Sequence, residues 1–206
     1  TVRVVHFRLE GIPAGWASMQ DLREAIITLN AAGKKTSVHL DQASNGELYL
    51  ASAADRVWMP PPGDLFLSGL GGRLSFFGNV LARFGIQVDM VAAGAYKSFG
   101  EPFTRSYASP ANREQLQALF GDLQDQMIAA IARGRSMEED AVSALLAQSP
   151  LSVHEAVEAG LIDDAVYADQ VEERLERLAG QDSVRVVSWG CLLYTSPEPT
   201  RPSSIS

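Results

Sequence analysis

The sequence contains little lysine, a single cysteine and no long apolar run. Only Lys34, Lys35 and Lys97 are lysines, and Cys191 is the one cysteine, so no disulfide can form within the chain. No apolar stretch approaches the roughly 20 residues that span a bilayer. The first residues, "TVRVVHFRLEG", lack the basic start and apolar middle of a signal peptide. We therefore expect the chain as given to be soluble.

Positive charge is also scarce, because the formal net charge is -8 at pH 7 with His neutral. Affinity for nucleic acid depends on clustered Lys and Arg side chains that displace counterions from phosphates. Nucleic acid is therefore excluded as an expected partner. The 206 residues are 46% hydrophobic and 20% charged, which is typical of one globular domain.

We expect three segments along the chain. Residues 1–183 form one α/β domain that begins in the middle of a strand and is truncated at its N-terminus. Residues 184–190, "VRVVSWG", start an interdomain segment. Residues 191–206, "CLLYTSPEPTRPSSIS", resemble the in-frame translation of a sequencing adapter, and the alternative is a native disordered tail. If the tail is not native, the native chain has no cysteine, which excludes thiol catalysis.

The first half of the chain alternates between strand-like and helix-like patterns. Strands are predicted at 2–9, 36–40, 56–59 and 86–93, and helices at 18–33, 46–54 and 73–85. Ser18 is the expected N-cap of the first helix, and Gly33 its end. Strands that alternate with helices predict a mainly parallel sheet covered by helices, with ligands beyond the carboxyl ends of the strands. Lys97 follows the last of these strands closely.

The second half is mainly helical. The stretch "SPANREQLQALFGDLQDQMIAAIARG" predicts one long helix with Ser109 as its N-cap. Seven apolar residues are expected on one face of this helix: Leu116, Leu119, Phe120, Leu123, Met127, Ile128 and Ile131. Two capping boxes, Ser136 with Glu139 and Ser152 with Glu155, predict further short helices.

The residues that commonly bind metals and cofactors offer no such site. His6, His39 and His154 are not spaced as ligands on one face, so structural roles are expected. "GIPAG" and "GLGG" do not match the glycine patterns that hold phosphates. We therefore expect neither a metal nor a cofactor.

Lys97 is the remaining candidate for chemistry. If Ala93, Ala95, Tyr96 and Phe99 shield it from water, burial lowers its pKa, and the neutral amine can act as a general base for a serine hydroxyl. The alternative is a solvated surface lysine in a loop.

Several stretches resemble one family in the right order. "GAYKSFGEPF" is similar to the G-x-Y-K-S-x-x-E-P-F segment of the signal peptide peptidase SppA family in its long, two-domain form. "ELYLASAAD", "SPANREQLQALF" and "AVEAGLID" resemble further elements, the last shared with the wider ClpP and crotonase superfamily. The resemblance covers about residues 3–180. It implies a ClpP/crotonase-type α/β fold and a Ser-Lys serine protease that degrades cleaved signal peptides.

The nucleophile of the short, single-domain form has no match here. Aligning the family's A-S-G-G-Y-Y segment on Gly46 and Tyr49 places Asn45 at the serine position, and asparagine cannot attack a carbonyl. Ser44 lies one residue early and is the alternative nucleophile. In the long form the N-terminal domain supplies the lysine and the C-terminal domain the serine. The resemblance therefore implies that this chain is the lysine-bearing half, inactive alone.

The resemblance also implies roles around the site. Lys97 is the expected general base. Ser98 either hydrogen-bonds the lysine or, as a turn residue, hydrogen-bonds the backbone. Glu101 either fixes the loop after the base or pairs with Arg105. The expected partners are peptide remnants of signal sequences, the missing C-terminal domain and further copies in a homo-oligomer. The full-length protein is expected to be bacterial and membrane-associated, with its anchor outside this chain. A non-catalytic scaffold and an acyl-CoA enzyme of the same superfold are the alternative functions.

Overall fold

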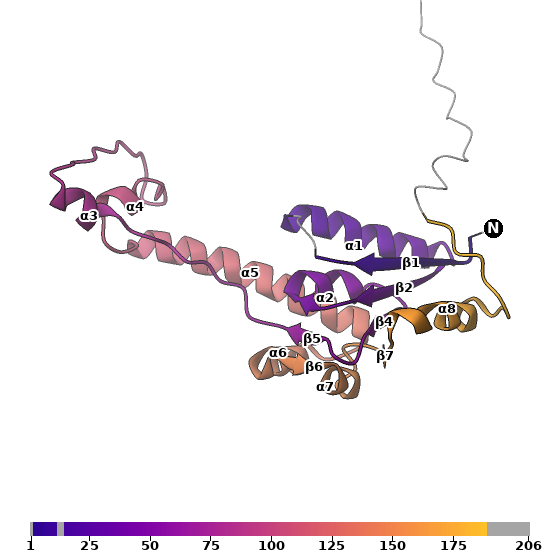
Figure 1. Cartoon of the computed structure of the whole chain (residues 1–206). Helices are drawn as coiled ribbons and strands as arrows, with labels where there is room; N and C mark the ends of the chain where they lie inside the picture. Colours follow the sequence, from indigo (N-terminus) through magenta and orange to yellow (C-terminus); the bar gives the residue numbers. More distant parts are fainter. Residues whose placement is uncertain (1, 12–14, 189–206) are drawn as a thin grey trace, which may run out of the picture.

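The computed structural model describes residues 2–11 and 15–188 (Figure 1). The expected adapter tail with Cys191, and the last two residues of 184–190, lie outside the described residues. The strands are β1 (Val4–Leu9), β2 (Lys35–Leu40), β3 (Ala43–Ser44), β4 (Arg56–Met59), β5 (Asp64–Phe66), β6 (Leu151–Ser152) and β7 (Asp164–Ala165). The helices are α1 (Trp16–Ala31), α2 (Asn45–Ala51), α3 (Gly78–Arg83), α4 (Glu101–Thr104), α5 (Pro110–Arg135), α6 (Glu139–Gln148), α7 (Val153–Glu158), the 3-10 turn η1 (Ala168–Gln170) and α8 (Val171–Ala179).

The body of the molecule is built on a parallel sheet. Its four strands lie in the order β1-β2-β4-β7, and every neighbouring pair is parallel. A second, smaller sheet has the order β3-β5-β6, in which β3 and β5 are parallel and β6 is antiparallel. The predicted α/β class with a mainly parallel sheet flanked by helices is therefore confirmed.

Hydrophobic residues cover both faces of the larger sheet. Successive strand residues point to opposite faces, so Val57 and Trp58 of β4 enter different clusters. Val57 belongs to the main core, which includes Ile26 of α1 and Leu48 of α2. Trp58 packs with Val166 and with Leu175 of α8. The sheet is thus a central layer with α1, α2 and α5 on one side and α8 on the other.

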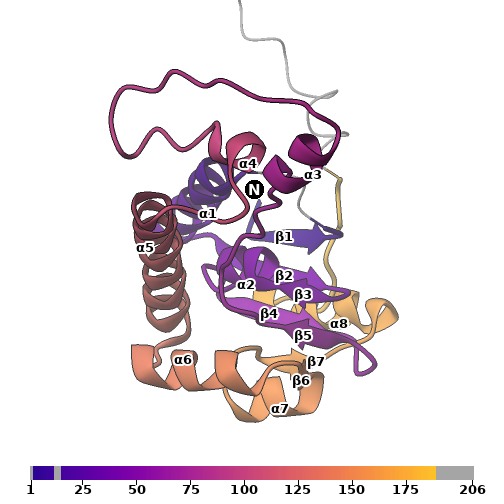
Figure 2. The ribbon, with the colours of Figure 1, turned by 90° about the vertical axis from the view of Figure 1, so that its left-hand side faces the viewer.

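Helix α5 extends well beyond this core. Met127, Ile128 and Ile131, near its C-terminal end, are buried, whereas Leu119 is exposed. The helix carries α3 and α4 at its far end, separated from the body (Figure 1). We call residues 70–108 the arm. Figure 2, viewed from the side of the arm, shows the loop of the arm in front of the body. The expected apolar face of α5 is therefore buried only at its C-terminal end.

The largest errors of the sequence-based prediction fall in the arm. No strand forms at 86–93, and the helix expected at 73–85 is reduced to Gly78–Arg83. An alternating pattern becomes a strand only when a neighbouring strand accepts its backbone hydrogen bonds. The arm lies away from the sheet, so residues 86–93 have no such neighbour among the described strands.

Two predicted caps also differ. Ser18 lies inside α1, whose N-cap is Gly15. Ser136 ends α5 in the left-handed conformation, with φ of 55°, and α6 starts after Glu138 instead. The Ser109 cap and the capping box of Ser152 with Glu155 are confirmed. Similar Ser-x-x-Glu patterns therefore occur at helix starts and just after helix ends.

The C-terminal part of α5 is held against α2 by the buried Arg23 of α1. The Arg23 guanidinium donates hydrogen bonds to the carbonyl oxygen of Tyr49, to the Ser52 hydroxyl at 2.7 Å and to the Ala130 carbonyl oxygen at 2.6 Å. Gly134 of α5 lies so close that a Cβ atom there would overlap the carbonyl oxygen of Ser52. The crossing of α2 and α5 therefore requires a residue without a side chain.

We expect Gly134→Ala to lower the free energy of unfolding by about 2 kcal/mol, because α5 must move away from α2 to accommodate the methyl group. The matched control is Gly121→Ala on the same helix, where no atom lies within 4 Å of the added Cβ. Gly121→Ala should stabilise the helix by up to about 1 kcal/mol. Urea unfolding of both variants measures the difference, and equal effects would contradict the close approach.

Candidate functional site

Lys97 lies in the loop of the arm between α3 and α4 and is exposed. Its backbone amide donates to the Gly94 carbonyl oxygen at 3.3 Å. The neighbours that could have shielded it are exposed too, with Tyr96 54% and Phe99 82% accessible. Of the two alternatives for Lys97, a shielded amine and a solvated surface lysine, the structure of this chain shows the solvated one. The physical reason is that the preceding segment does not join the sheet.

Glu101 joins the lysine loop to the start of α5. Its Oε2 atom accepts hydrogen bonds of 2.9 Å from the backbone amide of Ser109 and from Nδ2 of Asn112. The hydrogen bonds from Ser109 lower the pKa of Glu101; burial acts in the opposite direction, and the Asn112 amide and the charge of Arg105 lower it further. Of the two roles considered for Glu101, fixing the loop is the one that the geometry supports.

Both hydrogen-bond partners of this carboxylate belong to the capped start of α5. Ser109 caps the helix, because its hydroxyl accepts a hydrogen bond from the backbone amide of Asn112 at 3.1 Å. Ser109 and Asn112 are only 8% and 5% accessible. Sequence reasoning found the cap but missed Asn112, whose side-chain amide is visible in the sequence only as one more polar residue in a first helical turn.

A second contact joins the loop to α5 from the other side of Lys97. The Tyr96 hydroxyl donates a hydrogen bond to the Glu114 carboxylate at 3.1 Å, and this bond and the negative charge of Glu114 raise the pKa of Tyr96. The backbone carbonyl of Ser98 accepts from the Glu101 amide at 3.0 Å within the same loop. Residues 96 and 101, which flank the lysine, are thus both attached to α5.

Ser44 lies in a different part of the molecule. It is the N-cap of α2, and both its hydroxyl and its backbone amide donate to the Glu47 carboxylate. The Asn45 side-chain amide donates to the Ser68 carbonyl oxygen. Helix α2 packs on the body, whereas the loop of Lys97 lies at the opposite end of α5 (Figure 1). The structure therefore does not bring Ser44 and Lys97 together.

The histidines are engaged in separate contacts. Nδ1 of His6 lies 2.9 Å from the Ser37 hydroxyl, Nε2 of buried His39 lies 2.9 Å from the Val166 carbonyl oxygen, and His154 lies on the surface. Burial, with the charges of His39 and Arg8, lowers the pKa of His6 to about 4. Within the part of the chain that the structure describes, no cluster of three or more His, Cys, Asp or Glu side chains is arranged to hold a metal ion.

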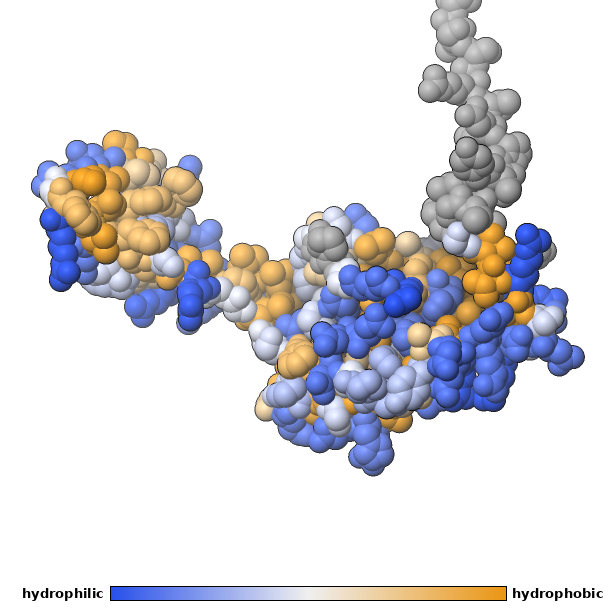
Figure 3. Space-filling model, viewed as in Figure 1, coloured by the Kyte–Doolittle hydropathy of each residue, from blue (hydrophilic) through white to orange (hydrophobic). Residues whose placement is uncertain are grey.

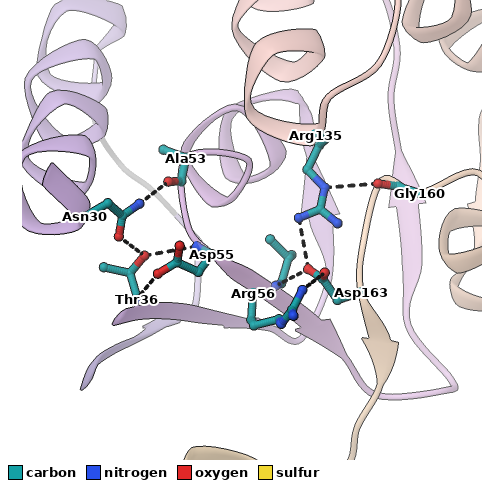
Figure 4. Close-up of polar contacts among 9 residues, drawn as sticks. Asn30, Thr36, Ala53, Asp55, Arg56, Arg135, Gly160 and Asp163 are labelled. Carbon is teal, nitrogen blue, oxygen red and sulfur yellow. Dashed lines mark hydrogen bonds and ion pairs between the residues drawn. The ribbon is translucent and has the colours of Figure 1, made fainter. Parts of the chain in front are cut away.

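Asp163 has a role that the sequence did not reveal. It is the last residue of the "AVEAGLID" element and accepts hydrogen bonds from Arg135, Arg56 and the Val57 amide at 2.9, 2.9 and 2.8 Å (Figure 4). Arg135 also donates from Nε to the Gly160 carbonyl oxygen at 3.0 Å. Burial alone would raise the pKa of Asp163, but the hydrogen bonds and charge of Arg135 and the Val57 amide outweigh it and lower the pKa.

The arm exposes many apolar side chains. Figure 3 shows them gathered over its tip, where α3 and α4 lie. The exposed residues of the arm include Leu74, Phe77, Val80, Phe84, Ile86, Met90, Val91, Tyr96, Phe99, Phe103 and Tyr107. Phe99 and Phe103, on either side of Glu101, are thus part of the surface of the arm and not of the core. Contiguous apolar surface of this kind is typical of a face that contacts another macromolecule.

A groove of about 720 Å³ lies between the arm and the N-terminal half of α5. Its apolar lining comes from both elements and includes Leu70, Leu74, Phe76, Tyr107, Leu116 and Phe120. The groove is open and combines apolar walls with a few polar groups, such as Arg113 and Gln117. These properties are typical of a site that binds an apolar ligand.

Among the helices described, within residues 2–11 and 15–188, none is both long enough and apolar enough to cross a bilayer.

Comparison with known proteins places the chain in a family. Residues 28–182 match Peptidase family S49. The chain is 27% identical over 176 residues to "Serine protease SPPA, chloroplastic" of Arabidopsis thaliana, covering 85% of this chain and 26% of that protein. It is 26% identical over 167 residues to "Protease 4" of Haemophilus influenzae, covering 77% and 27%. The chain thus spans about a quarter of the length of these relatives.

Two solved structures have weaker likenesses. An enoyl-CoA hydratase/isomerase family protein from Silicibacter pomeroyi matches with a TM-score of 0.45 and 18% identity, covering 89% of this chain and 66% of that one. A ClpP1 mutant from Listeria monocytogenes matches with a TM-score of 0.43 and 10% identity, covering 82% and 94%. These scores are too low to support a conclusion about this chain.

The family match, on a parallel α/β body with a projecting lysine-bearing arm, defines a peptidase-type domain. Because the family match covers most of its length, the chain belongs to peptidase family S49.

Proposed function

We propose that this chain is the lysine-bearing N-terminal half of a Ser-Lys serine endopeptidase that degrades cleaved signal peptides. The observation that carries the proposal is the segment "GAYKSFGEPF", whose Glu101 is hydrogen-bonded to the start of α5 and whose Lys97 projects from the arm. No serine hydroxyl is needed from this half if the C-terminal domain supplies it. Family membership and the relatives' names support the peptidase class.

The proposed reaction uses Lys97 as the general base. Its neutral amine takes the proton of a serine hydroxyl from the C-terminal domain while the serine oxygen attacks the peptide carbonyl. The resulting ammonium then protonates the leaving amine as the carbon–nitrogen bond breaks. Lysine can serve in this way only where water is excluded, because hydration favours the ammonium. The proposed enzyme must therefore cover Lys97.

The exposed apolar surface of the arm supports such a cover. Placing the C-terminal domain, or a further copy of the protein, against Phe99 and Phe103 would remove apolar surface from water and dehydrate the lysine together. The groove beneath the arm is a candidate site for apolar side chains of the peptide. We propose that the complete protein is a bacterial, membrane-associated homo-oligomer.

Three observations bear on the alternatives. The exposure of Lys97 is also what a non-catalytic scaffold domain would show, so this alternative has to be separated by experiment. Ser44 is engaged with Glu47 on the body, far along α5 from Lys97, which argues against it as the nucleophile. Membership in a peptidase family argues against an acyl-CoA enzyme.

The test uses the two-domain parent, recovered as the longer gene from the same source DNA. We expect the parent to hydrolyse a fluorogenic apolar peptide and a fluorophosphonate to label one serine, which mass spectrometry should place in the C-terminal domain. The 206-residue chain alone should neither hydrolyse the peptide nor be labelled. Labelling of Ser44 in either protein would overturn the split site, and an inactive, unlabelled parent would favour the scaffold.

A further inference from the structure

The lysine loop makes two side-chain hydrogen bonds to α5, and they lie on opposite sides of Lys97. Glu101 follows the lysine by four residues and bonds Ser109 and Asn112 of the first helical turn. Tyr96 precedes it directly and bonds Glu114, half a turn further along α5. The loop is therefore attached at both ends to one rigid helix.

The contact of Glu101 is the stronger of the two. It is a charge-assisted acceptor of two hydrogen bonds, and both partner residues are at least nine-tenths buried. The Tyr96 bond lies on the surface, where water competes for both groups. Most of the restraint on the loop therefore passes through Asn112 and the Ser109 cap.

Close packing within the arm transmits this restraint to the loop. A Cβ atom at Gly100, between Lys97 and Glu101, would lie 2.7 Å from Cγ of Met90, and one at Gly78 would lie 2.7 Å from the Arg105 carbonyl oxygen. The Phe77 amide also donates to the Pro102 carbonyl oxygen at 2.6 Å. The segments before and after the lysine are thus packed against each other as one unit.

The two carboxylates in the contacts between the lysine loop and α5 accept hydrogen bonds from neutral donors. Glu101 accepts from an amide and a side-chain amide, and Glu114 accepts from a phenol. Among the ion pairs of the described residues, none joins either carboxylate to Lys97. An ion pair would stabilise the ammonium over the neutral amine that a general base requires.

We infer that Asn112 and Glu114 of α5 are positioning residues that, through Glu101 and Tyr96, fix the loop of Lys97 for proton transfer. The inference rests on the proposed function for its catalytic consequence, but the anchoring itself can be measured independently. Misplacing a reacting group by about 1 Å can lower a rate about 100-fold. Asn112 therefore acts on the reaction without touching the substrate.

The test exchanges donor and acceptor across the contact. Asn112→Asp faces the Glu101 carboxylate with a second negative charge and removes the amide donor. Oε2 of Glu101 makes both contacts, so in the double variant Glu101→Gln with Asn112→Asp the new side chain must rotate its amide. Its nitrogen can then donate to the new carboxylate while its oxygen accepts from the Ser109 amide. Asn79→Asp, an exposed substitution on α3 with the same change in charge, is the matched control.

Two readouts separate the anchor from the catalytic proposal. In the 206-residue chain, Asn112→Asp should speed tryptic cleavage after Lys97 about 10-fold, as followed by mass spectrometry, because a released loop fits a protease more readily. In the two-domain parent it should lower kcat about 10- to 100-fold with KM changed less than about twofold. The double variant should restore both, and Asn79→Asp should change neither.

Each other result has a definite meaning. If Asn112→Asp changes neither cleavage nor kcat, or if the double variant restores neither, the anchor is overturned. If cleavage responds as expected but the wild-type parent does not hydrolyse peptides, the anchor stands and the proposed function fails. Tyr96→Phe removes one surface hydroxyl without burying a charge, so it can still be measured if Asn112→Asp does not fold. It should speed cleavage after Lys97 about twofold, because the hydrogen bond to Glu114 is lost. An unchanged rate would overturn the role of Glu114.

Discussion

Replacing Lys97 with alanine in the two-domain protein is expected to lower kcat/KM for an apolar peptide by a factor of about 10² to 10⁴, the usual contribution of a general base. Lys97→Arg should be equally inactive, because a guanidinium stays protonated and cannot accept the serine proton. Initial rates with a fluorogenic peptide measure the loss. Since Lys97 is exposed in this chain, neither substitution should disturb folding.

The small number of lysines provides a clean control. Lys35 is exposed at the start of β2, in the body and away from the arm, so Lys35→Ala should leave kcat/KM within about twofold of wild type. Full activity of Lys97→Ala, with assembly retained, would make the lysine a surface residue and this domain a scaffold. Partial activity of Lys97→Arg would argue against proton abstraction.

Replacing Asp163 with alanine is expected to lower the free energy of unfolding by about 2 to 3 kcal/mol, less than the loss of one partner of a fully buried ion pair, because the contact is partly buried. The side chain of Arg135 is only 9% accessible and would lose its carboxylate, while the Val57 amide would lose its acceptor. The loss would affect the junction of β4, the end of α5 and the turn after α7 (Figure 4). Urea unfolding followed by circular dichroism measures it.

The neighbouring aspartate is the matched control. Asp164 pairs with Arg174 at 2.7 Å on the surface, so Asp164→Ala should cost no more than about 1 kcal/mol. Similar losses for the two variants would show that the hydrogen bonds of Asp163 to Arg135, Arg56 and the Val57 amide add little stability. Because the folded-state pKa of Asp163 is lowered, its contribution is present above the unfolded value near 3.9 and is lost as pH falls through the folded value. Wild type and Asp163→Ala should therefore converge in strong acid.

The sequence predicts the body of this protein better than its arm. Strands β1, β2 and β4 and the helices between them follow from local patterns, because each apolar face meets the common core. The segment 86–93 has an equally good alternating pattern, but its environment depends on a neighbour that no local pattern specifies. The same reason explains why the sequence alone does not decide between a shielded and an exposed Lys97.

The candidate site is divided in the same way. Lys97, Glu101 and the Ser109 cap can be identified from short stretches of sequence. Asn112 and Asp163 cannot, because their roles depend on groups brought from elsewhere in the fold: Glu101 from α4 in one case, Arg135 and Val57 in the other. An isolated polar residue in a helix or turn gives no indication of such partners.

A small change in the angle of helix α5 is enlarged at its far end. The helix is held in the body where it crosses α2, at Arg23, Ser52 and Gly134, and we call this crossing the pivot. Residues 110–126 extend about 25 Å beyond the buried part at 1.5 Å per residue. Pro110 lies about 36 Å from Gly134 along the helix, so a change of about 5° in the angle at the pivot displaces the tip by about 3 Å, more than the roughly 1 Å of misplacement that can lower a rate about 100-fold. In the enzyme proposed above, the position of Lys97 would therefore depend on residues in the core, away from the site of reaction.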